Sequence, residues 1–218
     1  MTITKKQDFV DLKFTGKAND EIFDSNNEED LKKVNPDAKP EETIIVIGEG
    51  MVVPGLDEAL EGKELEKDYE IIVPCKEGFG ERKRELVRVI PLKAFTEQKV
   101  NPQTGMMLRL DNQVVKILAV SGARVTTDFN NPLAGKELNY KFKITKLVTD
   151  EKKKVETLIK LYFRFLPDYE IKENEIVVKG PKGMDIFINA YKEKFKELIG
   201  KDLSFEEAKP KEKPETKE

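Results

Sequence analysis

The sequence contains no histidine, no tryptophan and a single cysteine, Cys75. Without imidazole, Ser-His or Cys-His nucleophilic catalysis and histidine-ligated zinc, iron or nickel are excluded. One cysteine allows no disulfide within the chain, so a disulfide scaffold is excluded as well. We therefore expect no metal and no other cofactor, and we interpret Cys75 as an apolar filler.

Long hydrophobic runs are missing too. The opening stretch, MTITKKQDFVDLKF, has no apolar core of signal-peptide length. No segment approaches the roughly 18 apolar residues of a membrane span. We therefore expect a cytoplasmic protein without a membrane partner.

Neither sign of charge is in clear excess. Acidic residues number 42 and basic residues 39, which gives a formal net charge of -3. This balance provides no basic footprint for nucleic acid or for an anionic membrane. A ribosome- or nucleic-acid-associated factor is therefore disfavoured, and salt-dependent RNA binding would test it.

The length of 218 residues is sufficient for one large domain or two to three small domains. Strand-like runs, alternating or short and β-branched, occur at residues 10–14, 43–47, 69–73 and 138–144. The region 16–40 is polar and turn-rich apart from Phe23-Asp24. A short apolar-acidic stretch from Leu56 to Glu61 precedes Gly62, which stands where a C-cap glycine belongs.

The composition changes after residue 84. Four short strand-like runs between residues 85 and 128 (ELVRVIP, MMLRL, VVKILAV and ARVTTDF) are enough for a small independent β-unit. The strand at 138–144 suits the first domain better than this insert. Met106-Met107 fits either the core of the insert or an adaptable client-binding surface.

The C-terminal part has a third pattern. A helix is predicted from the i, i+3, i+4, i+7 spacing of Val155, Leu158, Ile159 and Tyr162. A strand at 175–179 and a helix from about Met184 to Leu198, ending at Gly200, follow. The apolar stripe at residues 158, 159, 162, 163 and 165 either packs on the C-terminal strand or forms a dimer contact. Residues 207–218 are rich in Pro, Lys and Glu and are predicted to be a disordered tail.

No nucleotide-binding loop, CxxC or HExxH motif is present, and the carboxylates are scattered. The sequence instead carries apolar and aromatic residues next to turns: Phe14, Phe23-Asp24-Ser25, Val52-Val53-Pro54-Gly55-Leu56, Gly78-Phe79-Gly80 and Tyr140. Taken singly, Phe14, Val52 and Val53 fit a core as well as a site. Phe23 and Tyr140 could be sheet packing, Asp24 could cap a turn and Pro54 could only form one.

The order of these motifs resembles the FKBP family, most closely its SlyD-like, long archaeal branch. The matching pieces are FDS at 23–25, IGEGMVVPGLDEALEGKELEKDYEIIV at 47–73, EGFGE at 77–81 and LNYKF at 138–142. The resemblance covers residues 8–148, and VPGLDEALEG is its strongest single piece. The block between Phe79 and Tyr140 is too long for a minimal FKBP flap and is similar to the insert-in-flap chaperone domain of SlyD.

This resemblance implies an α+β fold class: an FKBP-like half-open antiparallel sheet around a short helix, an inserted small β-domain and a C-terminal α+β domain. The expected ranges are 1–84 and 130–150 for the isomerase domain, 85–129 for the insert, 151–206 for the C-terminal domain and 207–218 for the tail. The implied function is that of a peptidyl-prolyl cis/trans isomerase and folding chaperone acting on X-Pro bonds of unfolded, proline-containing polypeptides. The alternative is a holdase or assembly factor with a non-catalytic groove, and a homodimer through the C-terminal domain is left open.

In the family the active site is an apolar pocket. The resemblance puts Leu56 on its floor and Asp24 on its rim. It assigns the walls to Phe14, Phe23, Val52, Val53, Phe79 and Tyr140. Many members have Trp where this chain has Leu56, and a Tyr hydroxyl common in the family is replaced by Phe79, so we expect weaker binding of rigid macrolides. The His- and Cys-rich metal tail of SlyD is absent, and nickel binding is not expected.

Overall fold

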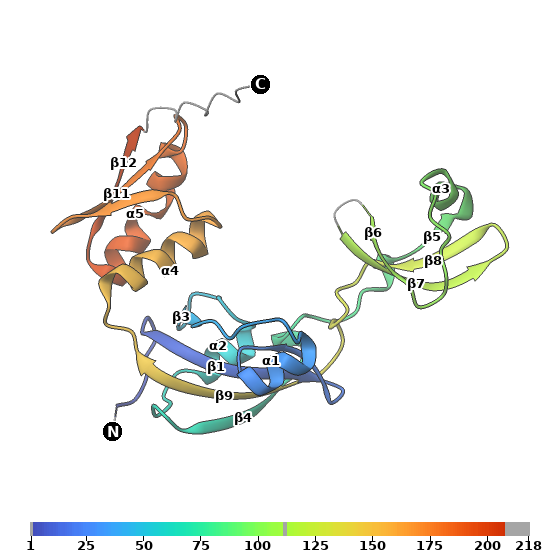
Figure 1. The fold of residues 1–218 in the computed structure, drawn as a ribbon, viewed down its shortest axis with the longest axis horizontal. Helices are drawn as coiled ribbons and strands as arrows, with labels where there is room; N and C mark the ends of the chain where they lie inside the picture. The colour runs from blue at the N-terminus through green and yellow to red at the C-terminus, as the bar shows by residue number, and fades with distance from the viewer. Residues whose placement is uncertain (1, 111–112, 208–218) are drawn as a thin grey trace.

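The computed structural model describes residues 2–110 and 113–207. Its strands form three separate sheets, of five, four and three strands. We name the corresponding parts the five-stranded unit (residues 2–84 and 129–149), the inserted unit (85–128) and the C-terminal unit (150–207). The inserted and C-terminal units lie at opposite ends of the five-stranded unit (Figure 1).

The five-stranded unit contains strands from both ends of the insertion. They are β1 (Phe9–Ala18), β2 (Glu21–Ser25), β3 (Ile44–Val46), β4 (Asp68–Val73) and β9 (Leu138–Leu147). The order is β2-β1-β9-β4, with β3 paired to β1, and every pairing is antiparallel. The placement of residues 138–144 in the first sheet is thereby confirmed.

The short helix α2 (Pro54–Ala59) lies against this sheet. Proline at its first position suits a helix start, because that position has no intrahelical N–H bond to lose. Leu56 and Leu60 face the core and are fully buried. The helix ends at Ala59 rather than 61, and Gly62, with φ +72°, belongs to the turn that follows instead of capping the helix.

The apolar run at residues 44–47 packs on both of its faces. Ile45 and Ile47 belong to the core of the five-stranded unit. Val46 points the other way, since side chains alternate along a strand, and it packs with residues of the C-terminal unit. Phe9 and Val148 join Val46 in this second core. The two units therefore share one hydrophobic cluster.

Neither helix α1 (Glu28–Val34) nor strand β2 was predicted, and the region 16–40 is correspondingly not all turns. The helix buries none of its residues, so it has no apolar stripe to reveal it. Its start is stabilised by Asn27, whose side chain accepts a hydrogen bond from the N–H of Glu29. Acidic residues occupy the first turn and lysines the last, which suits the helix dipole.

All four strands predicted in the insert are confirmed. They are β5 (Val87–Pro91), β6 (Met107–Leu110), β7 (Gln113–Ser121) and β8 (Arg124–Asp128), in the antiparallel order β5-β8-β7-β6. Helix α3 (Leu92–Glu97) is an addition that the pattern did not reveal. The core is small and centres on Phe95, Ile117 and Val125.

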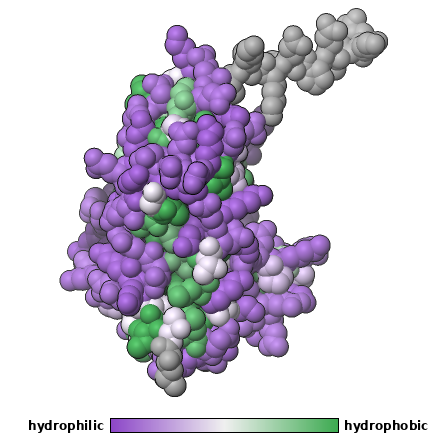
Figure 2. Space-filling view, turned by 90° about the vertical axis from the view of Figure 1, so that its left-hand side faces the viewer, coloured by the Kyte–Doolittle hydropathy of each residue, from purple (hydrophilic) through white to green (hydrophobic). Residues whose placement is uncertain are grey.

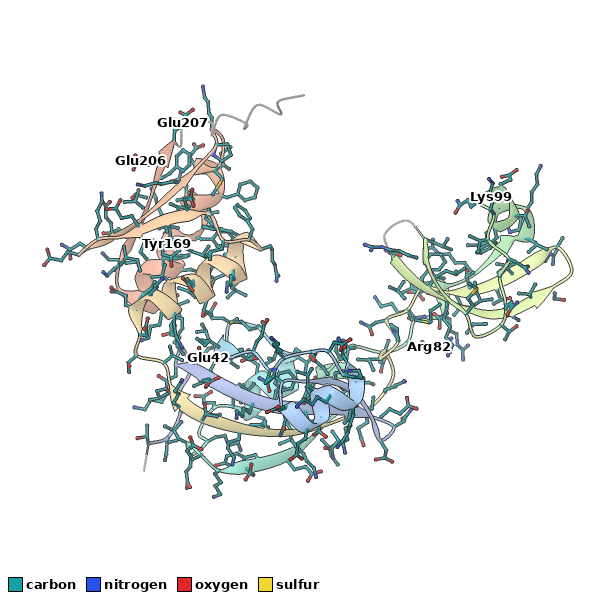
Figure 3. The ribbon with its side chains drawn as sticks, viewed as in Figure 1. Glu42, Arg82, Lys99, Tyr169, Glu206 and Glu207 are labelled. Carbon is teal, nitrogen blue, oxygen red and sulfur yellow. The ribbon has the colours of Figure 1, made fainter. Side chains whose placement is uncertain are left out.

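Two chain segments connect the insert to the five-stranded unit, and polar contacts hold them together. Arg82, labelled in Figure 3, donates to the Asp128 carboxylate at 2.6 Å. The Asn130 amide accepts from the N–H of Lys83 at 2.8 Å and donates to its carbonyl at 2.9 Å. Burial opposes ionisation of Asp128, but hydrogen bonds from Asn130 and Arg82 outweigh it and lower its pKa.

The C-terminal unit consists of α4 (Glu151–Phe163), β10 (Asp168–Ile171), β11 (Glu175–Gly180), α5 (Asp185–Ile199) and β12 (Asp202–Glu207). The two helices and β11 confirm the predictions, and Gly200, with φ +76°, caps α5. Strands β10 and β12 were not predicted. The apolar stripe on α4 packs in the core, where Leu158 and Ile159 are fully buried. Phe165, which follows the helix, is 52% exposed. Glu207 of the predicted tail ends β12, and residues 208–218 lie outside the described residues.

Among the described residues, no helix is both long and apolar enough to cross a membrane. The face shown in Figure 2 is largely hydrophilic, with hydrophobic residues in patches between hydrophilic ones.

Candidate functional site

Four aromatic side chains from distant parts of the sequence meet on one face of the five-stranded sheet. The ring centroids of Phe23 and Tyr140 are 5.8 Å apart, and those of Phe23 and Phe79 are 5.9 Å apart, both edge to face. Phe14 lies 6.3 Å from Tyr140. These separations are those of favourable aromatic pairs. Phe14, Phe23 and Phe79 are half-buried, so the cluster keeps part of its surface accessible.

Strand register explains how the rings meet. Gly16 of β1 lies opposite Asp24 of β2 and opposite Tyr140 of β9. The β1–β2 register shifts at Gly16/Lys17, which leaves Phe23 as an extra residue in a bulge. A Cβ on Gly16 would lie 2.7 Å from Phe23 Cζ and 2.9 Å from Tyr140 Cε1. Both rings therefore occupy the space that only glycine leaves free.

The turn into α2 brings the aliphatic part of the set to the same cluster. Val52 and Val53 are half-buried there, and Leu56 beneath them is 1% exposed. Gly55 allows α2 to approach β4, because a Cβ on it would lie 2.7 Å from Val73 Cγ1. Seven of the eight residues predicted for the site thus belong to one apolar cluster.

Asp24, the eighth, is exposed and lies outside the apolar cluster. Its charge nevertheless acts on the site. Burial, together with the charge of Asp24, raises the pKa of Tyr140 to about 12. The Tyr140 hydroxyl, which is protonated at neutral pH as any tyrosine hydroxyl with an ordinary pKa would be, can donate a hydrogen bond.

A polar network that the sequence did not reveal fixes the backbone on both sides of Phe14. The Asn26 side chain accepts from the N–H of Phe14 at 2.7 Å and donates to the carbonyl of Leu12 at 2.6 Å. The Ser25 hydroxyl donates to the carbonyl of Phe14 at 3.0 Å. The only signal in the sequence was that Ser and Asn, which commonly bond to nearby backbone, directly follow Phe23-Asp24.

A hollow with a charged lining lies beside β1 and β9. A cavity of about 930 Å³ is lined mostly by charged and polar residues, including Lys13, Lys141 and Lys143, and also by Phe14, Tyr69 and Phe142. Several of the charged residues are ion-paired, such as Lys143 with Asp68 at 3.2 Å. A charged hollow of this kind does not suit a prolyl ring, whereas the aromatic cluster does.

No group of three or more His, Cys, Asp or Glu side chains that could hold a metal ion occurs among residues 2–110 and 113–207. Cys75 is a free, half-buried thiol at the start of the short 3-10 turn Cys75–Glu77, which leads to Phe79.

Comparison with known proteins agrees with this arrangement. Residues 2–95 match the family described as FKBP-type peptidyl-prolyl cis-trans isomerase. Residues 88–133 match the family described as FKBP26, IF domain. The second match covers most of the inserted unit and its return segment, whereas β9, which completes the first sheet, lies beyond both matches.

The individual relatives are also named as peptidyl-prolyl cis-trans isomerases. A short-type peptidyl-prolyl cis-trans isomerase of Methanocaldococcus jannaschii is 30% identical over 147 residues, covering 66% of this chain and 94% of that protein. The SlyD isomerases of Haemophilus influenzae and Escherichia coli are 35% and 29% identical, over 43% and 44% of the chain. The aligned regions span about half the length of these SlyD relatives. The chain belongs to the FKBP-type peptidyl-prolyl cis-trans isomerase family.

Proposed function

We propose that the aromatic cluster is the prolyl-binding pocket and that the chain uses it as an isomerase and folding chaperone on unfolded polypeptides. Leu56 forms the floor and Asp24 the rim. The walls are Phe14, Phe23, Val52, Val53, Phe79 and Tyr140. The observation that carries the proposal is the convergence of these side chains from β1, β2, β9, α2 with the turn before it, and the segment after the 3-10 turn Cys75–Glu77.

The chemistry needs no nucleophile and no metal. Rotation about a peptide bond has a barrier of about 18–20 kcal/mol, mostly from amide resonance. The twisted amide is less dipolar than the planar forms, so it loses less on leaving water. An apolar pocket therefore binds the transition state better than the ground state, which is the condition for catalysis. The protonated Tyr140 hydroxyl supplies a hydrogen-bond donor at the edge of this pocket.

We further assign client binding to the inserted unit. Its surface carries exposed apolar side chains, including Val89, Met106, Met107 and Val114. Its first connection leaves the five-stranded unit directly after Phe79 and is fixed by Arg82 at Asp128. A client held on the insert is thereby tethered close to the pocket, which raises its effective concentration there.

Deletion of residues 85–128 tests this division of labour. We expect the deletion variant to keep its turnover of a proline-containing tetrapeptide, because the pocket residues all lie outside the deleted segment. Refolding of a protein limited by prolyl isomerisation should slow by about tenfold or more, since the tether is lost. Equal losses in the two assays would refute the tethering proposal.

A holdase or assembly factor with a non-catalytic groove is the alternative function. Leu56 and Phe79 favour it, because they replace the tryptophan and the tyrosine hydroxyl that many family members carry. Such a protein would bind unfolded chains without accelerating isomerisation, so the peptide assay separates the two functions.

We also propose a homodimer formed through the C-terminal unit. Four large apolar side chains on this unit are exposed although its core is well packed: Phe165, Leu166, Ile186 and Phe187. Light scattering should show twice the mass of the 25.0 kDa chain, and Phe187→Asp should reduce it to one chain. A single-chain mass for the unmodified protein at high concentration would contradict this proposal.

The ranges expected from the sequence, with the split isomerase domain at 1–84 and 130–150, are proposed as the functional domains. A cytoplasmic location is proposed with them, supported by the free Cys75 thiol and testable by cell fractionation.

A further inference from the structure

Glu49 lies in the turn between β3 and α2, yet its carboxylate contacts the C-terminal unit. Tyr162 of α4 donates to Glu49 Oε2 at 2.9 Å, and Lys194 of α5 donates to Oε1 at 2.9 Å. The Glu49 side chain is only 9% exposed. A carboxylate this well buried needs such partners, so the contact is a specific junction rather than a loose surface pair.

The contact with Glu49 also raises the pKa of both of its partners, Lys194 and Tyr162. The hydrogen bond and the charge of Glu49 raise the pKa of Lys194, although burial acts against this. Burial, and then the hydrogen bond to Glu49, raise the pKa of Tyr162. Tyr162 is itself held in place, because its ring stacks on Tyr191 with centroids 4.6 Å apart.

The turn that carries Glu49 is short and is fixed from its other side. The buried Asp57 carboxylate of α2 accepts hydrogen bonds from the N–H groups of Gly48 at 2.8 Å and Gly50 at 3.0 Å. Both glycines have positive φ, +87° and +66°, which makes the turn possible. Glu49 lies between the two glycines. The C-terminal unit therefore binds the centre of this turn through Glu49, and α2 binds its two ends through Asp57.

The same turn leads directly into the proposed pocket wall. Val52 and Val53 follow Glu49 by three and four residues. Between them and Glu49, Met51 packs against both the core of the five-stranded unit and the core shared with the C-terminal unit. A shift of α4 or α5 is therefore transmitted to the pocket wall through one side-chain contact and a few residues of backbone.

We propose that Glu49 is a positioning residue through which the C-terminal unit holds Val52 and Val53 in the wall of the prolyl pocket. The proposal rests on the pocket assigned above and adds a role for a part of the chain that contributes no residue to it. Isomerase activity then depends on the docking of α4 and α5, although neither helix touches the substrate.

The test uses the full-length chain with Glu49→Ala, Glu49→Gln and Tyr162→Phe. Loss of the anchor in Glu49→Ala should lower kcat/KM on a proline-containing tetrapeptide by about five- to tenfold, because small displacements of a binding wall have large effects on rate. Glu49→Gln keeps one oxygen that accepts from Lys194, and its NH2 group can donate to the Tyr162 hydroxyl oxygen, so it should keep more than about half of the activity. Tyr162→Phe should lie between them, and the methyl NMR signals of Val52 and Val53 should shift in proportion.

Glu42→Gln is the matched control, because Glu42 pairs with Lys153 at the same junction but outside the turn (Figure 3). It should leave kcat/KM and the two valine signals unchanged, even if it lowers the melting temperature as much as Glu49→Ala does. If Glu49→Ala does not fold, Tyr162→Phe replaces it in the test and should still lower kcat/KM and shift the signals of Val52 and Val53.

The two proposals fail in different ways. If the unmodified protein shows no turnover, the proposed function is wrong, while the valine signals of Glu49→Ala still decide on positioning. If the unmodified protein is active and Glu49→Ala changes neither kcat/KM nor the signals of Val52 and Val53, the positioning role is wrong. An equal effect of Glu42→Gln would also overturn it.

Discussion

Replacing Gly16 with alanine should lower kcat/KM on a tetrapeptide by about tenfold or more, because the new methyl group would enter space that the pocket rings occupy. Its position lies 2.7 Å from Phe23 Cζ and 2.9 Å from Tyr140 Cε1. Real Cβ contacts are longer, so at least one ring must move. The rings are held in turn by Phe14 and Phe79, and a shift of either one opens the apolar surface to water.

Gly180→Ala is the matched control for this change. Gly180 also lies in a strand, and its added methyl would meet the flexible side chain of Met184 in the C-terminal unit. We expect its kcat/KM to stay within about twofold of the unmodified protein, since Met adapts to such changes. Peptide kinetics and thermal unfolding on both variants separate loss of the pocket from loss of stability. Full activity in Gly16→Ala would show that the rings do not form the pocket.

Patterns of local sequence were sufficient for most strands and for the two long helices. The alternation around Leu12 and the helical spacing of Leu158 and Ile159 report burial on one face, which local sequence records directly. Helix α1 could not be predicted from the sequence, because none of its side chains is buried and no apolar periodicity marks it. Strands β10 and β12 could not be predicted from the sequence, because their alternating patterns are short and mixed with charged residues.

The membership of the site could be predicted only through the family resemblance. Composition and spacing alone left Phe14, Phe23 and Tyr140 as core candidates, since nothing local records which strands become neighbours. The pairing of β1 with β9 joins residues at least 120 positions apart in the chain. Asp24 is exposed, as a residue on the pocket rim would be, and its charge contributes to the raised pKa of Tyr140.

The contacts that hold the site were beyond sequence reasoning. Asn26 fixes the backbone around Phe14 from the next strand, and Asp57 fixes the turn before Val52. Glu49 connects that turn to helices more than 100 residues away. These are polar side chains in an abundantly charged sequence, and only the folded chain distinguishes them from surface residues.

Removal of the Phe23 ring should have the second large effect. Phe23 touches both Tyr140 and Phe79, so its ring links the two sides of the pocket. Losing an apolar contact worth about 1.5–3 kcal/mol lowers kcat/KM by about ten- to a hundredfold, provided the contact is made in the transition state. Because the side chain is half-buried, Phe23→Ala should remain folded. Phe165→Ala, at an exposed phenylalanine of the C-terminal unit, is the control.

The most direct measurement is therefore the rate of cis/trans interconversion of an X-Pro tetrapeptide, in an assay without protease, with the unmodified protein, Phe23→Ala and Phe165→Ala. Uncatalysed isomerisation takes roughly 10–100 s at 25 °C. We predict clear acceleration by the unmodified protein and by Phe165→Ala, and a loss of about tenfold or more in Phe23→Ala. A spontaneous rate in the presence of the unmodified protein, or full activity without the Phe23 ring, would contradict the account.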